Sequence, residues 1–187
     1  MAATTVSAAL DLVVREVGDL AARLDDAPAQ RALDLIEGAD RVFVHGAGRS
    51  GLALRMTAMR LMHLGLDAHV VGEVTTPAIR PGDLLLVASG SGTTTGIVQA
   101  ARTAVDVGAD VLAVSTTDDS PLGALAAVTL VVPAATKTDR SGSASEQYAG
   151  SRFEQAVVLL GDALFHALWT RSGRSADDLW PSHANLE

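Results

Sequence analysis

The N-terminal segment has the hydrophobic pattern of an amphipathic helix. Between residues 4 and 36 the apolar side chains recur every three or four positions, which predicts helix. Pro28 interrupts the pattern, so we expect a long helix, a break at residues 25–28 and a shorter helix that ends near Gly38. No strand pattern precedes this segment. It is therefore either an arm that packs on a partner subunit or a cover for one face of the domain.

Beyond residue 38, short apolar runs alternate with longer segments of helical periodicity. Nearly continuous apolar strands that alternate with helices indicate a parallel sheet covered on both faces. The strands are expected at 41–44, 68–71, 84–88, 111–115 and 128–132, and the helices at 50–64, 93–107, 121–126 and 151–171. We predict a single α/β domain with a five-stranded parallel sheet, which divides into an N-terminal helical arm (1–38), a core (39–172) and a C-terminal tail (173–187). The polar segment 133–150 is too long for a plain connection, which is typical of functional loops.

Two loops rich in glycine and hydroxyl groups follow the first and third predicted strands. Their sequences are GAGRSG at residues 46–51 and SGSGTT at residues 89–94. In each, a buried strand ends in a turn that opens a helix, where backbone N–H groups converge and the helix N-terminus adds partial positive charge. Such loops bind anions, and the hydroxyls of the second loop suit a phosphate monoester.

The residues that we expect to hold the phosphate come from both loops: Gly48, Ser50, Ser89, Gly90, Ser91 and Thr94. Serine and threonine at a helix start are also ordinary N-caps. Four hydroxyls and two glycines within residues 89–94 exceed what a cap needs, so we favour the phosphate cradle there. For Ser50, capping explains the residue almost as well. The Arg49 guanidinium could polarise a carbonyl group, or it could hold a subunit interface.

The first loop also matches the G-x-G-x-x-G pattern of dinucleotide-binding domains, and Glu73 lies where a ribose-binding acid is expected. Three features count against that interpretation. A chain of 187 residues has no room for a separate substrate domain, and the second loop would be redundant. Arg49 and Ser50 also place side chains where a pyrophosphate cradle needs slim backbone.

The amino-acid composition limits the kinds of partner that the protein can bind. The chain has 14 Lys and Arg against 22 Asp and Glu, a net charge of -8, and no Lys/Arg cluster, which argues against nucleic acid. Lys137 is the single lysine, so a phosphate must be held by backbone amides, hydroxyls and arginine. The chain has no cysteine, no signal-peptide pattern and no apolar stretch near the ~20 residues that span a bilayer. We expect a cytoplasmic protein without membrane contact.

The two loop motifs on a small α/β chain resemble the sugar isomerase (SIS) family over residues 33–168. Two more specific segments, QYAGSRFEQ at 147–155 and SHANLE at 182–187, resemble the 6-phospho-3-hexuloisomerases of the ribulose monophosphate pathway of formaldehyde fixation. Tyr148-Ala149 and Ser182 depart from the family pattern, which has Pro-Met and Arg at these places. The departures bear on the shape of the loop and on the role of the tail.

This resemblance implies that D-arabino-3-hexulose 6-phosphate is isomerised to D-fructose 6-phosphate through a cis-enediolate, with no cofactor and no metal. It implies Glu154 as the base, although an acid in the first turn of a helix is commonly a cap. Arg49 would stabilise the enediolate. His183 would act as an acid/base group in its own or in a neighbouring subunit's site. His63, at the end of a helix, could lie near the site or be structural.

The resemblance also implies a homotetramer or homodimer that is functionally coupled to 3-hexulose-6-phosphate synthase. Two rival functions remain open at this point. One is another phosphosugar isomerase of the same fold, and the other is a sugar-phosphate-binding module without catalytic activity.

Overall fold

The computed structural model describes residues 5–135, 145–148 and 150–186. The segment expected to form a functional loop, 133–150, is therefore described only in part, because residues 136–144 and 149 lie outside the described residues. Lys137 and Ala149 are among these.

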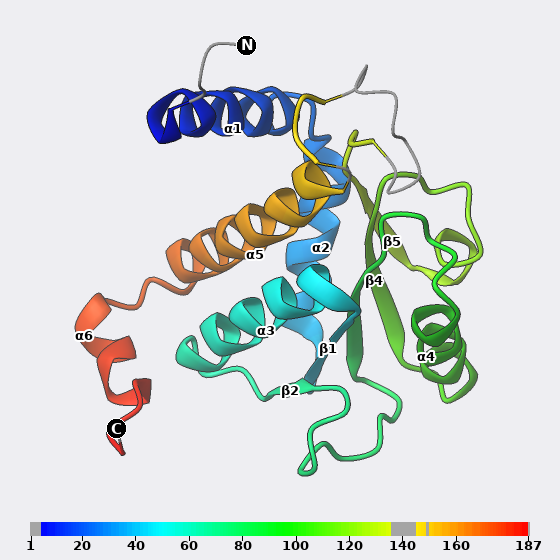
Figure 1. Cartoon of the computed structure of the whole chain (residues 1–187). Coiled ribbons are helices and arrows are strands. Elements are labelled where there is room, and N and C mark those ends of the chain that lie inside the picture. The colour runs from blue at the N-terminus through cyan, green and yellow to red at the C-terminus, as the bar shows by residue number, and fades with distance from the viewer. Residues whose placement is uncertain (1–4, 136–144, 149, 187) are drawn as a thin grey trace.

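The central sheet has five parallel strands, as predicted, and their order is β2-β1-β3-β4-β5 (Figure 1). The strands are β1 (Val42–Gly46), β2 (Ala68–Val70), β3 (Leu84–Ala88), β4 (Asp110–Ser115) and β5 (Val128–Val131). The strand order reverses between β1 and β3, and ligands of open parallel sheets bind outside the carboxyl ends of the strands at such a switch point. The loops at residues 46–51 and 89–94 follow the two strands that flank it.

Helices cover both faces of this sheet (Figure 1). One face carries α2 (Asp26–Gly38), α3 (Gly48–His63) and α5 (Ser151–Ser172), and the other carries α4 (Thr95–Asp106) and the 3-10 helix η1 (Gly123–Leu125). Helix α1 (Val6–Ala21) lies against α5 outside the layers. Helix α6 (Ala176–Leu179) and the 3-10 helix η2 (Trp180–Ser182) follow α5.

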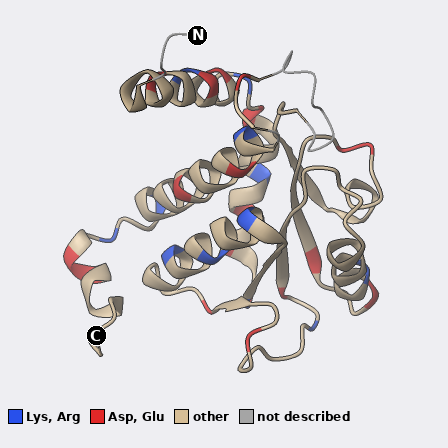
Figure 2. Cartoon of the chain, in the orientation of Figure 1, with Lys and Arg blue, Asp and Glu red and all other residues tan. Residues whose placement is uncertain are grey.

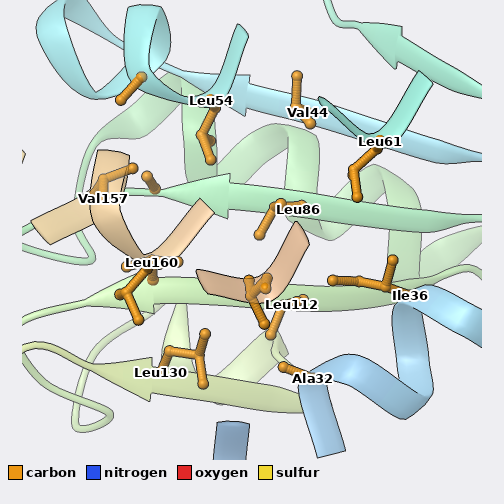
Figure 3. Close-up of a cluster of buried hydrophobic side chains, with 14 of the residues drawn as sticks. Ala32, Ile36, Val44, Leu54, Leu61, Leu86, Leu112, Leu130, Val157 and Leu160 are labelled. Carbon is orange, nitrogen blue, oxygen red and sulfur yellow. The ribbon is translucent and has the colours of Figure 1, made fainter. Parts of the chain in front are cut away.

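The larger core lies between the sheet and helices α2, α3 and α5 (Figure 3). Alternate side chains of β3 divide between the faces: Leu84 and Leu86 join this core, whereas Leu85 and Val87 join the smaller core under α4. This explains why the strand is apolar throughout. The labelled residues of Figure 3 show the meeting of layers: Ala32, Ile36, Val44, Leu54, Leu61, Leu86, Leu112, Leu130, Val157 and Leu160. Each fully buried leucine contributes about 1.5–3 kcal/mol of transfer free energy.

The break between the first two helices lies at residues 22–25, so the expectation of 25–28 was wrong. The Asp25 side chain accepts a hydrogen bond from the Ala27 backbone N–H and caps α2. Pro28 falls in the first turn of α2, where a backbone N–H has no intrahelical partner, so its missing donor costs little. The proline thus marks the beginning of the second helix.

The two helices of the N-terminal segment differ in burial. Helix α2 buries Ala32, Leu33 and Ile36 in the core, and is therefore a cover for the sheet. Helix α1 fully buries Leu20 alone among its described residues. At the other end of the chain, Ser175 and Asp178 form a capping box that begins α6. In the part of the chain that the structure describes, no helix is long and apolar enough to cross a membrane.

Candidate functional site

Three helices begin near the switch point of the sheet without a side-chain cap. The N-cap residues of α3, α4 and α5 are Ala47, Thr94 and Gly150, and none makes a side-chain capping hydrogen bond. The first N–H groups of a helix have no intrahelical partner, and together with the helix dipole they favour an anion. These helix starts therefore present backbone donors that no N-cap side chain takes up.

The loop after β1 is closed by two glycines. A Cβ atom on Gly46 would lie 2.9 Å from the Gly51 Cα, and one on Gly51 would overlap the Gly46 carbonyl oxygen. Gly48 opens α3 with a φ of +57°, a conformation that glycine adopts freely. Ser50 is buried in the first turn of α3 and is not the N-cap residue. The capping explanation of Ser50 is therefore wrong.

The hydroxyls of the loop after β3 interact in pairs. The Oγ of buried Ser89 lies 3.0 Å from the Oγ1 of Thr94, and the Ser91 Oγ accepts a hydrogen bond of 2.9 Å from the Thr93 Oγ1. Thr94 is the N-cap residue of α4, which begins at Thr95, two residues later than expected. Its hydroxyl is directed to Ser89 instead of the helix backbone. The hydroxyl groups of this loop therefore bond to one another, and none of them caps α4.

Thr116, just after the end of β4, is hydrogen-bonded to the loop at residues 89–94. The Gly90 carbonyl oxygen accepts hydrogen bonds from the Thr116 Oγ1 at 2.6 Å and from the Thr116 N–H at 3.1 Å. Sequence reasoning missed Thr116, although its place just after a strand adjacent to β3 is a signal that could have found it, because parallel strands end at one edge. These two hydrogen bonds fix the position of the Gly90 peptide relative to the carboxyl end of β4.

The first turn of α5 contacts both loops. The Glu154 carboxylate forms an ion pair with the Arg49 guanidinium of α3, with 3.1 Å between Oε2 and Nη1. The Glu154 side chain is 11% exposed and the Arg49 side chain 63% exposed. A Cβ atom built on Gly90 would lie 3.4 Å from the Phe153 ring, so α5 also packs closely on the second loop. Because Gly150 is the N-cap, Glu154 is not the capping residue of its helix.

The structure does not bring His183 to these residues within one chain. Its ring stacks on the His63 ring, with 4.2 Å between the centroids, and on the Trp180 ring at 4.8 Å. His63 follows Arg49 by fourteen residues of α3, which corresponds to about 21 Å along the helix. Burial, together with nearby His183 and Arg60, lowers the pKa of His63, which favours the neutral form of this ring in the stack.

The charged side chains are distributed unevenly over the helices. Figure 2 shows basic and acidic residues together on α1 and α5, whereas α3 carries Arg49, Arg55 and Arg60 and no Asp or Glu. Across residues 5–135, 145–148 and 150–186, no group of three or more His, Asp or Glu is placed to hold a metal ion.

The sequence and the fold of the chain both match known proteins. The SIS domain family model matches residues 35–158. A 3-hexulose-6-phosphate isomerase of Mycobacterium gastri is 53% identical over 178 residues, which cover 95% of this chain and 89% of the relative. One of Bacillus subtilis is 36% identical over 176 residues, with 94% and 95% covered. A crystal structure from Methanococcus jannaschii, described as inferring a function of 3-hexulose-6-phosphate isomerase, superposes with a TM-score of 0.82 at 27% identity, covering 95% of this chain and 98% of that one. The chain belongs to the SIS domain family, as its loop motifs indicated.

Proposed function

We propose that the protein isomerises D-arabino-3-hexulose 6-phosphate to D-fructose 6-phosphate, which is the 6-phospho-3-hexuloisomerase reaction. Two of its relatives are named 3-hexulose-6-phosphate isomerase. One observation carries the proposal. The Glu154–Arg49 pair lies beside two loops rich in hydroxyl and N–H donors. A base, a cation next to it and an anion cradle are the parts that an enediolate isomerase of a phosphosugar needs.

The reaction moves a carbonyl group from C3 to C2, so one proton leaves C2 and another arrives at C3 through a cis-enediolate. Glu154 takes the C2 proton as a carboxylate and returns a proton to C3 as a carboxylic acid. The proton of the C2 hydroxyl is meanwhile transferred to the C3 oxygen, which balances the charges. General acid–base catalysis of this kind contributes about 10²–10⁴-fold in rate.

The two loops and Arg49 hold the rest of the substrate in this proposal. The phosphate is bound by the hydroxyls and backbone N–H groups at Gly48, Ser50, Ser89, Gly90, Ser91 and Thr94. Arg49 orients Glu154 in the empty protein and, being largely exposed, can turn to the enediolate oxygens once the substrate is bound. Charge stabilisation of this kind is worth about 10²–10³-fold per donor.

The test is a coupled assay for fructose 6-phosphate with 3-hexulose 6-phosphate made in situ from formaldehyde and ribulose 5-phosphate. Wild type is compared with Glu154→Gln, in the presence of a chelator. We expect chelator-resistant turnover that falls by about 10² or more in the variant. Glu37→Gln is the matched control, because Glu37 forms an exposed ion pair with Arg171 away from the site. Sugar-phosphate binding without turnover by wild type would instead favour another phosphosugar isomerase or a non-catalytic binding module.

We also propose that His183 acts in the site of a neighbouring subunit of a homodimer or homotetramer. Supporting this, His183 is exposed and lies at the opposite end of α3 from Glu154 of its own chain. Apolar side chains are exposed along one side of each of two helices: Val6, Leu10 and Val14 of α1, and Leu52, Met56, Met59 and Met62 of α3. Exposed apolar surfaces of this kind commonly mark protein–protein contacts.

The substrate chemistry suggests which enzyme supplies the substrate, and the composition suggests the cellular compartment. A 3-hexulose 6-phosphate is the product of a synthase that condenses formaldehyde with ribulose 5-phosphate, so we propose functional coupling to that synthase. A chain without cysteine has no disulfide to gain from an oxidising compartment. We therefore place the protein in the cytoplasm.

A further inference from the structure

Glu16 of helix α1 lies within a dense set of hydrogen bonds just before the start of α5. Its carboxylate accepts from the Ser145 Oγ at 2.7 Å, the Glu146 backbone N–H at 2.8 Å and the Gln147 Nε2 at 2.9 Å. Its Oε2 is also 3.8 Å from the Arg152 Nε, and Arg152 donates from Nη2 to the Glu16 carbonyl oxygen at 3.3 Å. We call Glu16, residues 145–147 and Arg152 the Glu16 clamp.

The carboxylate at the centre of the clamp is mostly removed from solvent, with 14% of the Glu16 side chain exposed. Burial raises the pKa of Glu16, but the hydrogen bonds from the Glu146 N–H, Ser145 and Gln147 and the charge of Arg152 hold it below its ordinary value. The group is therefore ionised at neutral pH. Hydrogen bonds to an ionised acceptor are shorter and stronger than neutral ones, so the clamp resists displacement.

Helix α5 needs such a constraint, because nothing caps it from a side chain. Its N-cap is Gly150 with a φ of +85°, and the Ser151 N–H donates to the Tyr148 carbonyl oxygen. The Gln155 side chain, just after the first turn, donates to the Gln147 side chain at 2.8 Å, which links the helix again to the clamped segment. The beginning of α5 is thus located by residues 145–148.

Three consecutive residues of this first turn contact three different parts of the molecule. Arg152 reaches Glu16 of α1, Phe153 packs over Gly90 of the loop after β3, and Glu154 pairs with Arg49 of α3. A rotation or shift of the turn that releases Arg152 would therefore move Glu154 with it. Misplacement of a catalytic group by about 1 Å can cost 10²-fold in rate.

We propose that Glu16 is a positioning residue of the isomerase: by clamping residues 145–147 and Arg152 it fixes the first turn of α5, and so places the Glu154 carboxylate for proton transfer. This inference rests on the proposed function of Glu154. Helix α1 buries few side chains in the core. In this proposal its function is to hold the start of α5 through Glu16.

The test compares Glu16→Gln with Asp11→Asn, which removes a charge from an exposed position of the same helix. Rates are normalised to the folded fraction measured by circular dichroism. We expect kcat of Glu16→Gln to fall about 10- to 100-fold while KM changes less than about twofold, because the Glu16 carboxylate binds residues 145–147 and Arg152 and not the phosphate loops. Asp11→Asn keeps wild-type kcat and KM. Amide hydrogen exchange over residues 145–155 should rise in Glu16→Gln alone.

Two further variants separate positioning from a merely structural role. Arg152→Gln should lower kcat similarly, and the double variant with Glu16→Gln should be no worse than the worse single variant, since both break one unit. Ser145→Ala keeps the charges and should show a smaller loss of kcat in the same direction. Should Glu16→Gln keep its kcat within twofold per folded molecule, or raise KM alone, the proposal is overturned.

The exchange measurement also separates this inference from the proposed function. If wild type itself has no isomerase activity, the proposed function fails. Faster exchange at residues 151–155 in Glu16→Gln would then still support the clamp, and unchanged exchange would overturn it.

Discussion

At the scale of single residues, Asp83 shows how a buried charge is made tolerable. Its side chain is 0% exposed, and its two carboxylate oxygens accept from the Arg41 Nε at 2.9 Å and Nη2 at 2.6 Å. The Arg80 N–H donates a third hydrogen bond at 2.8 Å. Arg41 also donates to the Ala78 carbonyl oxygen, so the pair ties the β2–β3 connection to β1. This forked geometry supplies the partners that a buried carboxylate requires.

We expect Asp83→Asn to lower the free energy of unfolding by about 3 kcal/mol at pH 7, because it leaves the Arg41 guanidinium without its counter-charge. Burial alone would raise the pKa of Asp83, but hydrogen bonds from Arg41 and the Arg80 N–H hold it below its ordinary value of 3.8. A depressed pKa in the folded protein means that the stabilisation is present above 3.8 and is lost as pH falls through the lower folded value.

Urea unfolding at several pH values checks this. The difference between wild type and Asp83→Asn should be constant from pH 7 to about 5 and shrink below 3.8. Exposed Asp106→Asn is the matched control and should differ little from wild type at any pH. A difference that stays constant down to the lowest pH would contradict the assignment.

At the scale of elements, the placement of the candidate base and of Arg49 depends on how closely α3 and α5 pack. Gly161 of α5 faces Thr57 of α3, and a Cβ atom on Gly161 would overlap the Thr57 Oγ1. Thr57 is buried, and its hydroxyl is held by the Ala53 carbonyl oxygen at 3.3 Å. Helices α3 and α5 can pack this closely at Thr57 only because residue 161 has no side chain.

Gly161→Ala should therefore push the helices apart, with a loss of about 1–3 kcal/mol of stability from overpacking. Since Arg49 and Glu154 lie in the first turns of these helices, we also expect kcat to fall about tenfold. Thr57→Ala in the same protein removes the overlap with Oγ1 and leaves a 3.2 Å contact between the two Cβ atoms, so it should restore most of both quantities. Gly18→Ala in α1, where no heavy atom lies within 4 Å of the added Cβ, is the control and should be neutral or stabilising. Thermal unfolding and the coupled assay measure the two effects, and unchanged values for Gly161→Ala would contradict the packing argument.

The elements that the sequence predicted well are those with a strong local pattern. The five strands are continuous apolar runs, so each was located to within one or two residues. The largest difference is at β1, which extends to Gly46. Helices α3 and α4 begin at Gly48 and Thr95, because backbone geometry and not the hydroxyl residue set their starts. The meeting of Glu154 with Arg49 follows from topology once both are placed at the carboxyl edge. The contact of Glu16 with residues 145–147 has no local signature, because about 130 residues separate the partners.

At the scale of the whole molecule, the two groups of site residues lie at opposite ends of α3. The tail is fastened to the far end of this helix, where Arg174 donates to the Leu64 carbonyl oxygen at 2.7 Å and His183 stacks on His63. Leu179 is buried there, although the segment shows no periodic pattern in the sequence. Within one chain the tail therefore cannot serve Glu154 without leaving this place. A second subunit that presents its own fastened tail would serve it without such a rearrangement.

This arrangement predicts complementation between inactive subunits. Glu154→Gln and His183→Ala are each expected to have low activity alone, and light scattering should show both to be oligomers. If a site combines Glu154 of one subunit with His183 of another, equal mixtures refolded together contain intact sites in about a quarter of cases, because each of the two positions is correct with probability one half. Activity should then recover to about a quarter of wild type in the mixture. A site built from one chain gives no recovery, so mixed oligomers verified by native mass spectrometry but without activity would contradict a shared site.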